Sequence, residues 1–128
     1  MARSATETID INLFQDDFKN IDQKFLPSVV SIFSFTFDDK KQFLLMTKEA
    51  TYAYGKVICS WLSLKHDMAK PQRISPLDNM KIVQSDSGLD FFVILTDEGQ
   101  VFLASNVKSE WETNETLRLI NTVMIVSR

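Results

Sequence analysis

Cysteine and histidine occur once each in the 128 residues, as Cys59 and His66. A single cysteine forms no intramolecular disulfide, and one cysteine with one histidine does not make a zinc site. We therefore expect no metal, no cofactor and a reducing compartment, either cytoplasmic or nuclear. Basic residues are outnumbered as well, because 14 Lys and Arg stand against 17 Asp and Glu. The lack of a basic stripe makes nucleic acid an improbable partner.

Long apolar runs are also missing. No stretch reaches about 18 consecutive apolar residues, the length that a membrane-spanning helix needs, and the first ten residues carry acids instead of an apolar leader. The sequence therefore predicts no membrane partner. Groups for catalysis are equally few: we expect His66 in a solvated polar loop and Cys59 as a buried, inert thiol, and we expect no enzyme.

A segment that recurs about 50 residues later is the main feature present. Residues 43–49 are matched by 92–98 at a displacement of 49, and 52–61 are matched by 102–111 at a displacement of 50. The turn between the matched segments is therefore one residue shorter in the first copy. A period of this size, in segments rich in β-branched and aromatic residues, is typical of β-propeller blades and similar repeat arrays.

Short β-type runs fill both copies, and the expected strands are 29–37, 43–47, 51–54, 81–84, 91–96 and 100–104. Asp97-Glu98-Gly99 is the clearest hairpin turn, because Gly99 accepts the positive φ that such turns require. We expect a turn at 85–88 and an edge strand or ordered loop at 71–76, which two prolines bracket. Residues 117–120 and 123–126 are expected to open a third copy, with a short helix at 114–121 as the alternative.

The first 27 residues follow a different pattern and are expected to form a helical lead. Their apolar residues fall at spacings of three and four, namely Ile11, Phe14, Phe18, Ile21 and Phe25. This is a helix period, with Asp10 or Asn12 as the cap and Pro27 as the end. We expect the helix to lie against the rest of the fold, and a free helix offered to a partner is the alternative.

The repeat resembles those of the regulator of chromosome condensation family, which are seven-bladed propellers. Thr-Asp-Glu-Gly-Gln-Val-Phe at 96–102 matches the family's turn and strand, Tyr-Ala-Tyr-Gly at 52–55 matches the strand's end, and 70–74 matches the connecting segment. Gly88 takes the place of the glycine before the inner strand. The family's Gly-Gln-Leu-Gly loop is replaced by Ser-Trp-Leu-Ser at 60–63. We therefore interpret these as degenerate repeats, which are most similar to those of the family branch that joins a propeller to a BTB domain.

The resemblance implies an all-β fold: a partial β-propeller with a short N-terminal helix, in which 28–128 hold two degenerate repeats and the start of a third. It implies a protein–protein interaction module, as in a BTB-linked ubiquitin-ligase adaptor. The alternatives are a regulator of a small GTPase of the nucleotide-exchange type and a structural or assembly remnant. Two repeats leave sheet edges uncovered, so we expect further repeats or self-association. Trp61 and Trp111 occupy matching positions, where we expect a structural role, with anchors for a partner as the alternative.

Overall fold

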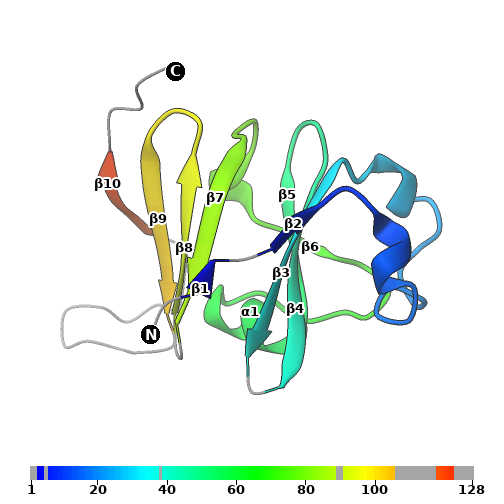
Figure 1. Ribbon diagram of the computed structural model, residues 1–128. Helices are drawn as coiled ribbons and strands as arrows, with labels where there is room; N and C mark the ends of the chain where they lie inside the picture. Colours follow the sequence, from blue (N-terminus) through cyan, green and yellow to red (C-terminus); the bar gives the residue numbers. More distant parts are fainter. Residues whose placement is uncertain (1–2, 5, 38, 89–90, 106–117, 123–128) are drawn as a thin grey trace.

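The computed structural model describes residues 3–4, 6–37, 39–88, 91–105 and 118–122. Within these residues, two five-stranded antiparallel sheets pack against each other (Figure 1). The first sheet has the order β2-β3-β4-β5-β6, with β2 at Thr6–Thr8, β3 at Ser31–Phe37, β4 at Lys40–Met46, β5 at Thr51–Tyr54 and β6 at Gln72–Arg73. The second has the order β1-β7-β8-β9-β10, with β1 at Arg3–Ser4, β7 at Ile82–Ser87, β8 at Phe91–Thr96, β9 at Gln100–Ser105 and β10 at Arg118–Thr122. The prediction of mainly β structure is confirmed.

The two sheets are built on one plan, as their pairing registers show. Phe43 pairs with Tyr54 in the first sheet, and Phe92 pairs with Ala104 in the second. These positions are displaced by 49 and 50 residues, so the sequence repeat is also a structural repeat with one more residue in the second hairpin turn. Gly99 lies in that turn with φ of +84°, a conformation that glycine adopts at little cost, and the hairpin prediction is confirmed.

The two sheets stack front to back, because they meet through faces that are not equivalent in the repeat. The front face of the first sheet packs on the second sheet through Leu44, Met46 and Ala53. The second sheet meets it with the opposite face, its back face, which carries Phe92, Ile94, Phe102 and Ala104. Because alternate side chains of a strand point to opposite faces, the counterparts of Leu44 and Ala53 on the second sheet turn away from this core.

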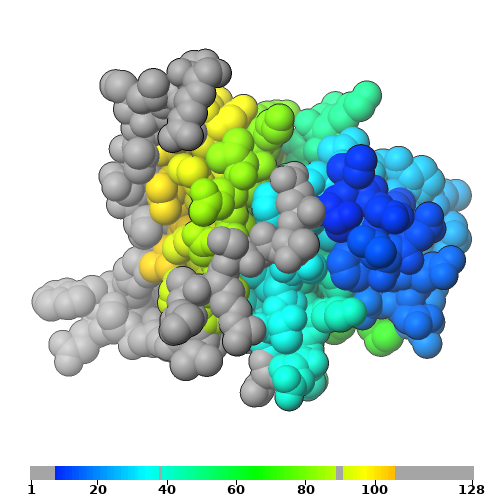
Figure 2. Space-filling model, in the orientation of Figure 1, coloured from blue at the N-terminus to red at the C-terminus, as the bar shows by residue number. Residues whose placement is uncertain are grey.

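Residues 11–29, here called the N-terminal segment, form a third layer on the back face of the first sheet (Figures 1 and 2). The continuous helix expected here is wrong: the structure has two short 3₁₀ helices, η1 at Ile11–Phe14 and η2 at Leu26–Ser28, joined by turns. Asp10 caps η1 by accepting a hydrogen bond from the Asn12 N–H. The apolar spacing still predicted the packing, because Phe18 and Ile21 are buried against Phe43 and Leu45.

Three further segments differ from expectation. The turn expected at 85–88 is instead part of strand β7, which continues to Ser87. Within this strand the Ser85 hydroxyl donates a hydrogen bond to Val93 O at 2.7 Å. A helix, α1 at Lys56–Trp61, follows β5, where no helix was predicted. Finally, residues 118–122 form strand β10, which pairs with β9 at the edge of the second sheet, so this part of the alternative helix at 114–121 is a strand. Residues 123–126 lie outside the described part of the chain.

The proline-bracketed segment behaves as predicted. Gln72–Arg73 forms the short edge strand β6, which pairs only with β5. Both edges of the first sheet are thus strands of two or three residues. Short edge strands offer few free backbone groups to another chain, so the first sheet exposes little edge for pairing.

Candidate functional site

Trp61 lies in the core between the sheets. Its side chain is 5% exposed, and its ring is 4.6 Å from the Phe37 ring and 6.3 Å from the Phe92 ring, measured between centroids. Helix α1 places it there, because Ile58, Cys59 and Trp61 share the face of the helix that covers the sheets. The burial of Trp61 supports the structural role and not the alternative of an exposed anchor for a partner. Trp111 lies outside the described residues.

Cys59 and His66, which have reactive side chains, are buried and half-buried. Cys59 is 1% exposed, and burial raises the pKa of its thiol from 9.0 to about 11, so the thiolate is disfavoured at neutral pH. The expected buried thiol is confirmed. His66 is half-buried, with its ring 6.1 Å from the Tyr54 ring and its Nδ1 enclosed without a hydrogen-bond partner in the structure. It is therefore less solvated than the sequence suggested.

Within the part of the chain that the structure describes, no group of three or more His, Cys, Asp or Glu residues is placed to hold a metal ion. Among the same residues, no helix combines the length and the apolar character needed to cross a bilayer.

The front face of the second sheet is partly exposed in the described part of the chain. Its outward side chains on β8 and β9 include Val93, Leu95, Val101 and Leu103. All four are partly exposed, and none belongs to either of the two buried clusters. Their counterparts in the first sheet include Leu44 and Met46, which are 0% and 6% exposed because the second sheet covers them. The front face thus has the character of an interface without its partner layer.

The strand beside this apolar stripe is polar. Asp86 and Gln84 point outward from β7, and their side chains are joined by a hydrogen bond of 3.3 Å. In the first sheet the position of Asp86 is held by Phe33, which is 2% exposed. Burying a lone carboxylate is costly, so a layer placed here must leave Asp86 in water or bring a cation to it.

The unbroken apolar runs at 91–95 and 101–104 indicate from the sequence that both faces of these strands are apolar. The runs do not indicate which of the two faces is covered. That depends on where the first sheet packs. No protein-family model, curated protein or solved structure matches the chain.

Proposed function

We propose that this chain is a protein–protein interaction module built from two stacked repeats of the propeller type, with the front face of the second sheet as its docking surface. The observation that carries this proposal is the front-to-back stacking, which buries Leu44 and Met46 in one copy and leaves Val93 and Leu95 partly exposed in the next. The resemblance to the regulator of chromosome condensation repeats supports the same proposal. Repeat units of this kind bury their apolar faces only against a neighbouring layer.

The array in this proposal is open, with one covered end. In a closed propeller, the last blade would pack on the back face of the first sheet. Here the N-terminal segment occupies that face, with Phe18 and Ile21 each 2% exposed. A terminal cap of this sort is what a linear stack requires. The front face of the second sheet is then the end at which a partner adds.

The chemistry of the front face defines the partner. Val93, Leu95, Val101 and Leu103 call for an apolar surface two strands wide, and Asp86 calls for a Lys or Arg at its margin. A protein substrate or a scaffold bound by an adaptor fits this description, as in the ligase adaptors of the BTB-linked branch. An assembly role, in which a second copy covers the face, is the alternative that the same apolar stripe supports.

The experiment compares the double variant Val93→Lys/Leu103→Lys with the wild type. Partners are captured from cell extract by cross-linking and identified by mass spectrometry, and the oligomeric state of each purified protein is measured by light scattering. We expect a defined partner to be captured by the wild type and lost in the double variant, because two buried ammonium groups would disrupt a desolvated interface. Both positions are partly exposed, so the fold tolerates the change.

Leu13→Lys is the matched control, because Leu13 is 65% exposed on the N-terminal segment and belongs to neither buried cluster. The partner must survive this substitution. Concentration-dependent dimers that vanish only in the double variant would establish the assembly role instead. Equal capture by all three proteins, with a monomer at every concentration, would refute the docking surface.

A further inference from the structure

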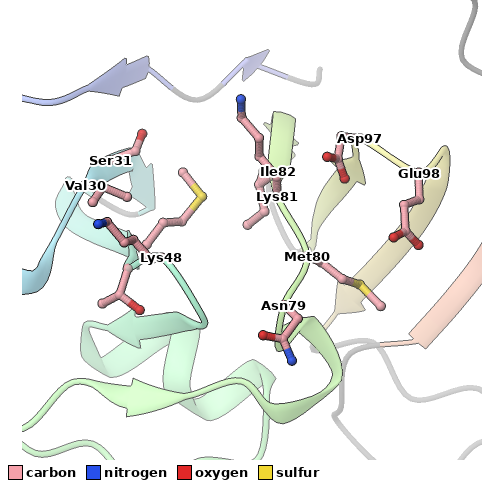
Figure 3. Close-up of a pocket in the computed structure, with 11 residues that line it drawn as sticks. Val30, Ser31, Lys48, Asn79, Met80, Lys81, Ile82, Asp97 and Glu98 are labelled. Atoms are coloured by element: carbon pink, nitrogen blue, oxygen red, sulfur yellow. The ribbon is translucent and has the colours of Figure 1, made fainter.

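A groove lies between the two sheets at the end where their hairpin turns meet, away from the front face. Its volume is about 310 Å³, within the range of ligand pockets. Figure 3 shows its two walls: Val30, Ser31 and Lys48 come from the first sheet and its turn, while Asp97 and Glu98 come from the turn of the second. The floor is apolar, formed by Met46, Met80 and Ile82.

Backbone hydrogen bonds hold the walls at their spacing. The segment that joins them, 79–82, is tied to the first turn by the Asn79 N–H, which donates to Glu49 O at 2.7 Å. It is tied to the second turn by the Asp97 N–H, which donates to Lys81 O at 2.9 Å. Asn79 adopts a φ of +60°, a left-handed conformation that asparagine tolerates better than most residues. The groove is therefore a fixed feature of the fold.

The rim carries four charges that the fold leaves unused. Lys48, Lys81, Asp97 and Glu98 are all exposed, whereas the ion pairs among the described residues join Lys41 to Asp17 and Arg73 to Asp78. The two carboxylates are neighbours on one wall, and Lys48 stands on the other (Figure 3). A ligand that crosses the groove thus meets Lys48 at the first sheet and, at the second, the two carboxylates together with Lys81, where negative charge outnumbers positive by two to one.

The groove continues beyond its first hollow. A second hollow of about 370 Å³ shares Val30, Thr47 and Lys48 with it and extends over the N-terminal segment to Phe25 and Tyr52. Val30 forms the ridge between the two hollows and is 46% exposed, although it is apolar. The two hollows lie in a row and each combines apolar with polar lining residues, which suits an extended chain better than a compact small molecule.

We infer that this groove binds an extended peptide segment of another protein, one that places two apolar side chains in the two hollows and a Lys or Arg beside Asp97 and Glu98. Carboxylates at the second-sheet end give the peptide its direction, because the basic residue must lie there. Met46 and Met80 adapt to aliphatic side chains of different shapes, so the apolar positions are tolerant. The site is separate from the front face and does not depend on it.

The test selects binders from a displayed library of random nine-residue peptides on the full chain, and then measures the affinity of the enriched peptides by fluorescence anisotropy. We expect the enriched peptides to share two apolar residues followed or preceded by a basic one. Binding is expected to weaken at least about tenfold in Val30→Lys and in Glu98→Lys, which change the ridge and the acidic wall. Raising the salt concentration should weaken it further.

Leu13→Lys and Asp16→Lys are the controls for the added lysine and for the charge reversal, because both positions are exposed and line neither hollow. Circular dichroism and the unfolding midpoint of each variant verify that it is folded. The proposal fails if no peptide is enriched, if the enriched peptides bind Val30→Lys and Glu98→Lys as tightly as the wild type, or if only Val93→Lys/Leu103→Lys abolishes their binding.

Discussion

Gln42 supports helix α1 from inside the first sheet, and its replacement offers a sharp test of the fold. The side chain is 2% exposed, and its Oε1 accepts hydrogen bonds from the N–H groups of Val57 at 3.0 Å and Ile58 at 3.1 Å. The residue that precedes the helix, Gly55, has no side chain with which to cap it. Gln42→Met keeps the length of the side chain and removes the acceptor.

The expected loss follows from one buried donor, the Ile58 N–H, and one partly buried donor, the Val57 N–H, that are left without a strong acceptor. Each unsatisfied buried N–H costs about 1–3 kcal/mol, and the apolar thioether recovers part of this through burial. We expect the free energy of unfolding to fall by about 2–3 kcal/mol, a large share of the roughly 5–15 kcal/mol typical of a domain. With a slope of about 1.5 kcal/mol per M, the urea midpoint falls by about 1.3–2 M.

The assay is urea unfolding followed by far-ultraviolet circular dichroism. Gln84→Met is the matched control, because Gln84 is exposed and its side chain bonds only to that of Asp86 at the surface. That variant should stay within about 0.5 kcal/mol of the wild type. If Gln42→Met and Gln84→Met unfold at the same midpoint, the amide of Gln42 does not carry the helix and the reasoning is refuted.

Two more predictions concern the same region. The folded-state pKa of Cys59, about 11, exceeds the unfolded value of 9.0, so its contribution to stability is complete below pH 9 and is lost as pH rises through 11. At pH 8, iodoacetamide should label Cys59 only after denaturant is added, and rapid labelling of the native protein would contradict its burial. Gly55→Ala should destabilise by about 1–3 kcal/mol in thermal unfolding, because φ is +130° and the new Cβ would meet the Gln42 side chain; an unchanged midpoint would argue against that contact.

Much of the sheet structure follows from local signals. Polar and apolar residues alternate in 31–37, which predicts a strand buried on one face, whereas 43–46 are all apolar, which predicts a strand buried on both faces. The structure has strands at both places. Gly99 marks the hairpin, and the prolines at 71 and 76 mark the edge. These predictions succeed because they depend on backbone preferences and on side-chain period, both of which operate within a few residues.

The failures occur where distant contacts decide. Spacings of three and four at the N-terminus fit an α-helix, but the Asp22 N–H donates to Ala69 O and the Asp22 side chain accepts from the Lys24 N–H, which draws the chain into turns. Ser85 and Ser87 have turn-forming side chains, yet pairing with β8 extends the strand through both. Helix α1 depends on an acceptor from Gln42, about 15 residues earlier in the chain, which no local pattern contains.

The candidate site divides in the same way. The repeat at 43–49 and 92–98 determines that each copy has a strand with two apolar faces, because consecutive residues of that strand are apolar and they point to opposite faces. Only the packing of the sheets decides that the first copy has both faces covered and that Val93 and Leu103 in the second face outward. The sequence by itself therefore determined the strands, the hairpin and the repeat, since these rest on local preferences. The tertiary structure decided which face stays open and where the groove forms, because these depend on what packs against each strand from elsewhere in the chain.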